Sequence, residues 1–456
     1  MNPSLSFQGG TLVLKGIEQD QAVHPVFQWI KARWRCEAYH YPLICDWLSM
    51  HAVRDSVPRW QALRLNLQDK REPHAYQLEA LAAWEQANQR GSIVLPTGAG
   101  KTFVAIHAIR QVGRSTLVVA PTIDLLHQWY ACLTNAFNTA IGVYYGAEKV
   151  VQPITVTTYH SAGDIMAAAG SQFKLVIFDE VHHLPAPSWG ETALMSPAPC
   201  RLGLTATYPE PHEQTDGRWS VEQLIGPIVY EKRLEELVGE QLADYRTERI
   251  RVDLTAAERQ QYAADHAIYS DFFRARQLPQ THGAQWWREM MRLSAFDEEA
   301  RHALLARQRI GRLLAGAEGK MAALDRLLSE HIHERILIFS ESNEIVYQIA
   351  CRHLIPALTH ETKAAERKMI LEAFQAGHYH ALVTSKVLNE GVDVPEAKVA
   401  IVLGGSAGAR EYIQRLGRVL RKVGNRQAVL YEIIVRKTVD EARAQRRRPR
   451  QVSEPC

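Results

Sequence analysis

The chain has 456 residues, with 53 Lys and Arg against 50 Asp and Glu, and 46% of its residues are hydrophobic. This length predicts about three domains, with enough buried core that neither disulfides nor metals are needed for stability. No run of about 18 apolar residues occurs, which excludes a transmembrane helix, and the polar start MNPSLSFQGG lacks the layout of a signal peptide. We therefore expect a soluble intracellular protein.

The cysteine pattern argues against a covalent framework. Six cysteines are scattered along the chain without a CxxC pair, which favours reduced cytosolic thiols. Cys36, His40, Cys45 and His51 include the ligand types of a zinc site. Their spacing matches no finger pattern, and their aromatic and apolar neighbours favour a small core instead. We expect residues 1–72 to form a small N-terminal α+β module, whose role the sequence leaves open.

Short apolar runs alternate with helical patterns from about residue 90 onward. Strands that alternate with helices predict doubly wound parallel sheets with βαβ crossovers. We expect one such α/β domain over residues 73–245 and a second over residues 246–456. The expected strands cover residues 92–95, 116–120, 154–157, 174–179 and 201–205 in the first domain, and residues 335–340, 380–385 and 399–404 in the second.

Residues 254–318 are dense in helix formers and nearly free of strand pattern, so we expect a helical insertion there. Aromatic residues alternate with arginines in it, an arrangement that stacks bases or braces phosphates. Aromatic rings in a small helical hairpin more often form its core, and this alternative is favoured for the rings. The aromatic residues are Phe272, Phe273, Trp286 and Trp287, and the arginines are Arg274, Arg276 and Arg288.

The C-terminal segment 436–456 is rich in arginine. Such a basic tail is able to contact phosphates. A solvated, frayed chain end explains the same composition equally well.

The strongest chemical signal is the segment LPTGAGKT at residues 95–102, placed where an apolar strand turns into a helix. In such a loop the backbone N–H groups and the helix N-terminus surround phosphate oxygens, Lys101 reaches the β and γ phosphates, and Thr102 is a ligand for Mg²⁺. Leu95 replaces the first Gly of the simplest pattern. The predicted nucleotide-binding residues are Thr97, Gly98, Ala99, Gly100, Lys101 and Thr102.

An acidic pair follows a second expected strand in KLVIFDEVHH. Ligands gather at the carboxyl ends of parallel strands. Asp179 is therefore predicted to hold Mg²⁺, and Glu180 to polarise the attacking water as general base. His182 and His183 follow directly, and for His183 a local hydrogen-bonding role is equally compatible with the sequence.

Arg415, Arg418 and Arg421 recur every three residues in YIQRLGRVLRK and share one helix face. A solvated basic face is one explanation. The other explanation is that these arginines supply positive charge at the γ phosphate in the transition state of ATP hydrolysis. An ATP site split between two domains would convert hydrolysis into relative domain motion.

Five motifs occur in the order typical of superfamily 2 helicases and translocases: PTGAGKT (96–102), DEVH (179–182), TAT (205–207), NEGVDVP (389–395) and QRLGRVLR (414–421). The resemblance covers about residues 73–435. The segment RLGLTAT followed by LIGPIVYEK, and the helical insertion, resemble the XPB branch, whose members translocate on double-stranded DNA and carry an insertion called a thumb.

The resemblance implies two RecA-like lobes and assigns further residues. Gln77 would read adenine, while Gly391, Asp393 and Arg415 would join the ATP site, with Arg418 and Arg421 as catalytic arginines. The residues that would couple ATP hydrolysis to movement on the nucleic acid are His182, Thr205, Thr207 and Gln414. Nucleic-acid contacts would come from Thr122, Thr158, Arg274, Arg276 and Arg288.

Two departures from the family pattern qualify these expectations. His74 stands where the family usually has Arg, which bears on adenine selectivity. The Arg-Glu-Asp triplet that commonly follows TAT is missing, which bears on strand separation but leaves translocation intact.

We expect an ATP-driven, Mg²⁺-dependent translocase or helicase on double-stranded DNA without sequence specificity, cytoplasmic or associated with the nucleoid in a bacterium. The open alternatives are an RNA helicase, the motor subunit of a restriction or defence complex, and an ATP-gated nucleic-acid clamp. A partner nuclease or a larger complex is a further expectation, and a membrane partner is not expected.

Overall fold

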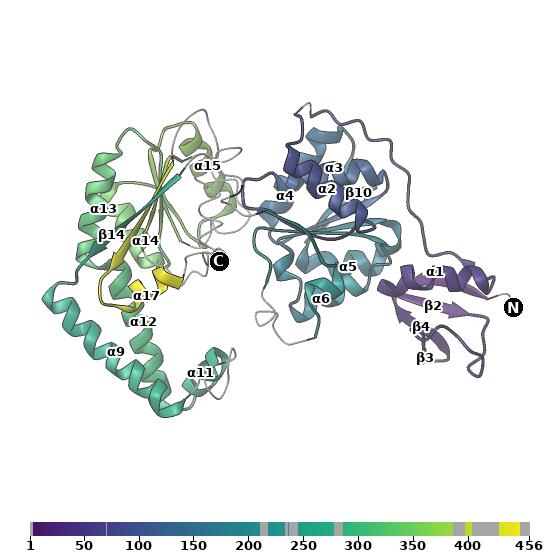
Figure 1. The fold of residues 1–456 in the computed structure, drawn as a ribbon, viewed down its shortest axis with the longest axis horizontal. Coiled ribbons are helices and arrows are strands. Elements are labelled where there is room, and N and C mark those ends of the chain that lie inside the picture. Colours follow the sequence, from purple (N-terminus) through teal and green to yellow (C-terminus); the bar gives the residue numbers. More distant parts are fainter. Residues whose placement is uncertain are drawn as a thin grey trace, which may run out of the picture. The chain divides into compact units, whose positions relative to one another are not determined.

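The computed structural model describes residues 3–69, 71–209, 218–232, 236, 245–277, 286–385, 397–403 and 428–446. It divides into two compact units, residues 1–233 and 234–456. Each unit has its own parallel sheet with helices packed against it (Figure 1). No helix within the described ranges is both long and apolar enough to cross a membrane.

A five-stranded sheet covered on one face by a helix forms the N-terminal module (Figure 1). Leu12 and Leu14 alternate with outward-facing residues, so one sheet face is apolar and packs with Ile44. Cys36 belongs to this core and Cys45 packs against it, which confirms the small core expected around the cysteines. The elements are β1 (Ser4–Gln8), β2 (Thr11–Lys15), β3 (Gln28–Ile30), β4 (Arg33–Glu37), α1 (Tyr41–Met50) and β5 (Arg54–Asp55), in sheet order β3-β4-β2-β1-β5.

An eight-stranded sheet forms the centre of the first domain, in the order β13-β6-β12-β11-β7-β10-β8-β9. Neighbouring strands are parallel except β8 and β9, and helices cover both faces (Figure 1). The strands are β6 (Arg90–Val94), β7 (Thr116–Ala120), β8 (Ile141–Tyr145), β9 (Glu148–Val150), β10 (Ile154–Thr158), β11 (Leu175–Asp179), β12 (Cys200–Thr205) and β13 (Ile228–Glu231). The helices are α2 (Ala75–Gln86), α3 (Lys101–Val112), α4 (Ile123–Phe137), α5 (Tyr159–Ala169), α6 (Pro187–Leu194) and α7 (Val221–Leu224).

All five strands expected in the first domain are confirmed, as β6, β7, β10, β11 and β12. The sequence pattern missed β8 and the two edge strands, β9 and β13. The residues of β9 are exposed and those of β13 are at most half-buried. β9 therefore lacks the apolar run that marks a strand buried on both faces, whereas β13 (IVYE) has a short apolar run at residues 228–230 that lies at the sheet edge.

Tyr39, in the short 3-10 helix η1 (Ala38–His40), joins the module to the first domain. Its ring centre lies 4.7 Å from the guanidinium carbon of Arg90 and 4.7 Å from that of Arg201. Its hydroxyl donates to the carbonyl of Gln223. The aromatic face therefore offsets positive charge on both sides.

Arg201, in β12, is 1% exposed. Its guanidinium donates to backbone carbonyls of four residues, Ala193, Ser196, Ala198 and Leu224. Burial lowers the pKa of Arg201 to about 9, so the side chain still carries its charge at neutral pH. One buried cation thus holds together the segment before β12 and the end of α7.

The second unit is built on a six-stranded parallel sheet, in the order β14-β19-β18-β15-β17-β16. The three strands expected here are confirmed as β15, β17 and β18, whereas β14, β16 and β19 were missed. β14 begins at Tyr245, next to the boundary expected between residues 245 and 246. The elements are β14 (Tyr245–Val252), α13 (Glu318–Glu330), β15 (Ile336–Phe339), α14 (Asn343–His353), β16 (Ala357–Leu358), α15 (Ala364–Gln375), β17 (Ala381–Thr384), β18 (Val399–Val402), β19 (Ala428–Val435) and α17 (Val439–Arg446).

Helices α9 (Ala256–Arg276), α11 (Trp286–Ser294) and α12 (Glu298–Gly316) occupy the segment expected as a helical insertion. Phe272 is buried with Met290 and Ala300, and Phe273 and Trp286 pack against this cluster. The favoured core role of these rings is therefore confirmed, while the side chain of Trp287 lies outside the described part.

The first half of the expected basic tail is a packed helix rather than a frayed end. In α17, Asp440 is buried and accepts a hydrogen bond from Lys320 Nζ at 2.6 Å. The Val439 N–H donates to the hydroxyl of Tyr262 at 2.9 Å. Residues 447–456, which hold the remaining arginines, lie outside the described residues.

Replacing Arg201 by Met tests its role in the fold. The substitution leaves four buried carbonyls without their donor, and we expect the free energy of unfolding to fall by at least about 3 kcal/mol. Urea denaturation of Arg201→Met measures this loss. The control is Arg114→Met at an exposed position, where the change should stay within about 0.5 kcal/mol. Equal effects at both positions would contradict the structural role.

Candidate ATP site

The loop between β6 and α3 has the shape of a phosphate-binding loop. Gly98 and Gly100 have φ angles of 87° and 76°, in the left-handed region that favours glycine. A Cβ atom at Gly100 would lie 2.5 Å from Nε2 of Gln77, so the close approach also requires glycine there. Gly100 is the N-cap of α3, and the loop therefore meets the positive end of that helix dipole.

Lys101 begins α3 and folds back over this loop. Its Nζ donates to the carbonyls of Leu95 at 3.1 Å and Pro96 at 3.4 Å. Its positive charge also acts on Asp179, where it opposes the rise of the carboxyl pKa. The ammonium group is thus close both to the loop and to the acidic strand end.

Gln77 braces the loop from the first turn of α2. It is 3% exposed, its Oε1 accepts from the His74 N–H at 3.0 Å, and its Nε2 donates to the Ala99 carbonyl at 3.1 Å. The hydroxyl of Tyr76 donates to the same carbonyl at 2.8 Å. The adenine contact expected of Gln77 stays a prediction, since in this structure both ends of its amide already bond the protein.

Asp179 ends β11 and is buried with both carboxylate oxygens hydrogen-bonded. Oδ2 accepts from Nε1 of Trp129 at 2.8 Å, and Oδ1 accepts from the Glu180 N–H at 3.0 Å. Burial raises the pKa of Asp179, while the Trp129 hydrogen bond and the Lys101 charge lower it. The carboxylate of Asp179 and the hydroxyl of Thr102 are the hard oxygen donors that suit Mg²⁺, so these residues fit the expected ion.

A polar path leads from Glu180 to the TAT segment. Glu180 has a left-handed backbone with φ 47° and ψ 54°, a conformation that costs free energy in a non-glycine residue. Its Oε2 lies 3.5 Å from Nδ1 of His182, and that Nδ1 lies 2.9 Å from Oγ1 of Thr205. Thr205 in turn donates to the carbonyl of Thr207 at 2.8 Å. With its own proton directed to that carbonyl, Thr205 accepts from His182, which places the His182 proton on Nδ1.

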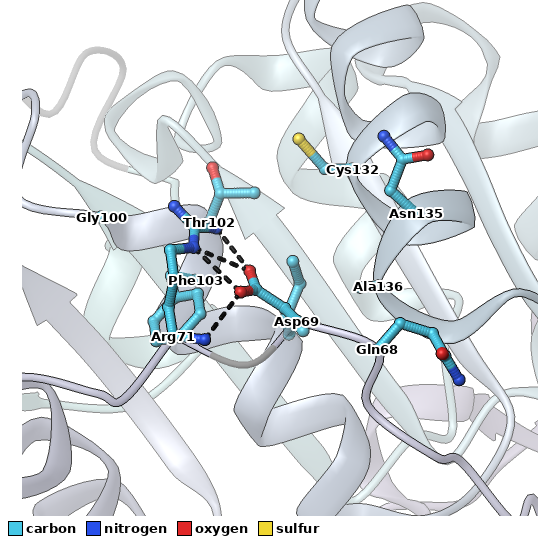
Figure 2. Close-up of a pocket in the computed structure, with 10 residues that line it drawn as sticks. Gln68, Asp69, Arg71, Gly100, Thr102, Phe103, Cys132, Asn135 and Ala136 are labelled. Carbon is cyan, nitrogen blue, oxygen red and sulfur yellow. Dashed lines mark hydrogen bonds and ion pairs between the residues drawn. The ribbon is translucent and has the colours of Figure 1, made fainter.

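A cavity of about 410 Å³ lies beside the loop (Figure 2). Arg71 and Phe103 meet at one side of it, with the guanidinium carbon 5.0 Å from the ring centre. Nε of Arg71 lies 3.0 Å and 2.9 Å from the two carboxylate oxygens of Asp69, and Arg71 lowers the pKa of that carboxyl. The lining residues are Gln68, Asp69, Arg71, Gly100, Thr102, Phe103, Ile106, Cys132, Asn135 and Ala136.

Sequence reasoning missed this cavity, because its lining comes from three separate segments. The sequence offered two weak signals: the aromatic Phe103 immediately after the GKT of the loop, and Arg71 shortly before α2. Neither residue forms a motif alone. Their meeting depends on the placement of residues 68, 69 and 71 beside α3 and α4, where the Gln68 N–H donates to the Ala136 carbonyl at 2.8 Å.

Thr122 and Thr158, expected at the nucleic acid, lie at the carboxyl ends of the adjacent parallel strands β7 and β10. Oγ1 of Thr122 accepts from the Leu125 N–H at 3.3 Å and caps α4. Thr158 is 5% exposed. Their contacts with nucleic acid stay predictions.

The insertion arginines form exposed ion pairs. Arg274 lies 3.2 Å from Asp271, and Arg276 lies 2.7 Å from Asp297. Exposed pairs of this kind are weak enough to be exchanged for phosphate contacts. The side chain of Arg288 lies outside the described part of the chain, and DNA contact by these arginines stays a prediction.

The remaining predicted site residues fall outside the described ranges, so the structure does not place them. They are Gly391, Asp393, Gln414, Arg415, Arg418 and Arg421.

The Trp129 hydrogen bond offers a test of the Asp179 site. Trp129→Phe removes a donor that orients Oδ2 and favours the charged carboxylate, so we expect half-maximal ATPase activity to need about tenfold more Mg²⁺. Titration of ATPase activity with Mg²⁺ measures the change. Trp84→Phe, which removes a buried indole hydrogen bond to the Arg201 carbonyl at 2.9 Å, is the matched control and should leave the Mg²⁺ requirement unchanged. An unaltered requirement in Trp129→Phe would remove Trp129 from the site.

Two family models match the chain. Residues 70–210 match the type III restriction enzyme, res subunit, and residues 319–423 match the helicase conserved C-terminal domain. Among solved structures, the helicase domain of Hef from Pyrococcus furiosus aligns with a TM-score of 0.53 and 19% identity, over 84% of this chain and 100% of that one. This likeness confirms the expected α/β class with two RecA-like domains.

Sequence relatives include a DNA 3'-5' translocase XPB2 from Sulfurisphaera tokodaii, 40% identical over 84% of this chain and 86% of the relative. The DNA 3'-5' helicase XPB of Mycobacterium tuberculosis is 30% identical over 78% of this chain and 59% of the relative. An Arabidopsis thaliana protein named general transcription and DNA repair factor IIH helicase/translocase subunit XPB1 is 25% identical over 87% and 49%. Given the identity to the first of these over most of both sequences, the chain belongs to the XPB family of superfamily 2 helicases.

Proposed function

We propose that this chain hydrolyses ATP and uses the free energy to translocate along duplex DNA. The observation that carries the proposal is the polar path from Glu180 through His182 and Thr205 to Thr207. It connects the candidate general base after β11 with the segment after β12. A displacement at Thr207 would therefore alter the position of Glu180, the candidate general base. Coupling of ATP hydrolysis to movement along DNA requires such a connection.

The roles of the other site residues follow from their positions. Lys101 and the loop N–H groups would hold the phosphates and offset their charge, and Glu180 would polarise the attacking water. Asp179 and Thr102 would hold Mg²⁺. When bound, this ion offsets negative charge on the phosphates.

Duplex DNA is the proposed track because the relatives are named as DNA translocases and helicases. The proposed contacts through Thr122, Thr158 and the insertion arginines would be made to phosphates. Phosphate contacts position a protein without reading the sequence. We accordingly propose binding without sequence specificity, in the cytoplasm or at the nucleoid, and work with a partner nuclease or a larger complex stays a prediction.

The cavity beside the loop is proposed to receive the nucleobase. It opens next to Gly100 and Thr102, so the base of a nucleotide held by the loop has this space available. Arg71, held by Asp69 against Phe103, presents a planar cation for stacking (Figure 2).

Substitutions at Lys101 and Glu180 test the enzyme. Lys101→Ala should abolish measurable ATP binding and lower turnover by at least about 100-fold. Glu180→Gln should bind ATP normally, since its size is kept, and lose about 100-fold to 10,000-fold in turnover. Binding of a fluorescent ATP analogue and steady-state ATPase assays measure the two effects. Lys149→Ala, at an exposed ion pair, is the control, and normal hydrolysis by Glu180→Gln would refute the base assignment.

A comparison of duplex DNA with single-stranded RNA tests which nucleic acid the chain moves along. ATPase activity should rise with duplex DNA and the stimulation should weaken steeply with salt. Stimulation by single-stranded RNA alone would favour an RNA helicase, and tight binding without turnover would favour a clamp. Displacement of a third strand from a triplex then separates translocation from strand opening.

Arg71→Ala tests the nucleobase site. Loss of the stacking cation should raise the KM for ATP about tenfold and leave kcat within about twofold, because a weak stacking contact is removed from bound and transition states alike. Arg64→Ala, at an exposed position of the same linking segment, should change neither constant. An unchanged KM in Arg71→Ala would exclude the base from this cavity.

A further inference from the structure

The chain leaves the first compact unit directly after the edge strand β13. The boundary between the two units lies between residues 233 and 234, and Lys232 is the last described residue before it. The covalent connection to the second unit therefore begins at Lys232. The contacts that Lys232 makes within the first unit fix the place from which this connection starts.

The backbone of Lys232 is bonded to the strand that leads into the phosphate loop. β13 pairs in parallel with β6, and the Lys232 N–H donates to the carbonyl of Val94 at 3.0 Å. Leu95 follows Val94, and its carbonyl accepts the hydrogen bond from Nζ of Lys101 at 3.1 Å. A single hydrogen bond thus joins Lys232 to the residue next to a carbonyl that holds the Lys101 ammonium group.

The side chain of Lys232 reaches α2. Its Nζ lies 3.7 Å from Oε2 of Glu79 and 5.9 Å from the ring centre of Tyr76, over the ring. The same Oε2 of Glu79 accepts from the hydroxyl of Tyr230, in β13, at 2.7 Å. A carboxylate and an aromatic ring both attract the ammonium group, so the two contacts favour one position of Lys232. We call Tyr76, Glu79, Tyr230 and Lys232 the exit cluster.

Tyr76 joins the exit cluster to the phosphate loop. It is 3% exposed, and its hydroxyl donates at 2.8 Å to the carbonyl of Ala99, which lies between Gly98 and Gly100. Burial raises the pKa of Tyr76 to about 12, so at neutral pH the hydroxyl keeps the proton that this bond needs. Closely packed side chains have little room to absorb a displacement. A shift of the Ala99 carbonyl therefore displaces the ring beneath Lys232.

We propose that Tyr76, Glu79 and Lys232 are positioning residues that transmit nucleotide binding from the phosphate loop to the start of the connection between the units. Phosphates that enter the loop shift its backbone at Ala99, the hydroxyl and ring of Tyr76 follow, and Lys232 passes the displacement to the chain that leaves the first unit. This role rests on the proposed ATP-driven function and adds a route by which the ATP site acts on the second unit.

The exit cluster lies on a different side of β6 from the polar path through His182 and Thr205. In the sheet order, β6 has β13 on one side and β12, which ends at Thr205, on the other. The polar path begins at the candidate general base, whereas the exit cluster begins at the loop that holds the phosphates. The cluster therefore responds to binding of the nucleotide, and the polar path to the position of the base.

Hydrogen exchange of the full chain, with and without a non-hydrolysable ATP analogue and Mg²⁺, tests the exit cluster. We expect the analogue to slow amide exchange in the peptide that contains residues 228–232 by about tenfold, because the bond from the Lys232 N–H to Val94 opens less often. Lys232→Met and Tyr76→Phe should bind the analogue and lose most of this protection. In Tyr76→Phe the Ala99 carbonyl keeps its bond from Gln77. Lys232→Arg keeps the cation and should keep the protection.

Steady-state ATPase activity gives the functional readout for the same variants. Lys232→Met should leave the KM for ATP and the kcat without DNA within about twofold, because Lys232 lies outside the ATP site. The kcat with saturating duplex DNA should fall about fivefold, since binding and movement are less tightly connected. Lys232→Met combined with Tyr76→Phe should lower it no further than the stronger single variant, because both interrupt one path.

Lys149→Met is the matched control. Lys149 lies in β9, at the opposite edge of the same sheet, with Nζ 3.6 Å from Asp164 and 5.4 Å from the ring centre of Tyr144. It therefore loses the same two kinds of contact, and it should keep wild-type protection and wild-type stimulation by DNA. Thermal melting establishes that every variant folds.

Two results would overturn the role of the exit cluster. One is wild-type chain that binds the analogue without protection of residues 228–232, and the other is protection in Lys232→Met equal to that of the wild type. Equal losses in Lys149→Met would do the same. Protection that depends on Lys232, in a wild type whose ATPase is not stimulated by DNA, would refute the translocase function and leave the exit cluster standing. Failure of the wild type to bind the analogue would refute both.

Discussion

The parallel pairing of β6, β12 and β11 is the constraint on which the candidate ATP site depends. Thr205 pairs with Val94 and Asp179 pairs with Leu204, so three carboxyl ends meet at one edge of the sheet. The phosphate loop, the TAT segment and the acidic pair each leave one of these ends. A slip of one residue in either ladder would turn alternate side chains to the other face and separate the groups.

Two buried charged side chains, Asp179 and Arg201, lie at opposite ends of this sheet's strands and have different surroundings. At the carboxyl end, burial raises the pKa of Asp179, with Lys101 and Trp129 opposing the shift; a carboxylate held in this way interacts strongly with a cation because little water screens it. At the amino end, Arg201 is satisfied by carbonyls and the ring of Tyr39. The surroundings of Asp179 suit the binding of a ligand, whereas Arg201 contacts the N-terminal module through Tyr39.

The module thereby becomes part of the first compact unit instead of a separate appendage. Its apolar face is used internally by α1, and its edge contacts the first domain through Tyr39. The overall charge of +3 gives no hint of a buried cation such as Arg201, because an average over 53 basic and 50 acidic residues carries no information on where either kind is placed.

The sequence by itself determined the motor core. Local patterns predicted the glycines of residues 98–100, the acidic pair after an apolar strand and the strands buried on both faces. Each of these features depends on backbone conformation or burial within a few residues. The edge strand β9 was missed, since its exposed residues form no apolar run. Only the tertiary structure decided that Arg71 meets Phe103 and that His182 lies between Glu180 and Thr205. Those arrangements depend on contacts between segments far apart in the chain, which no local pattern encodes.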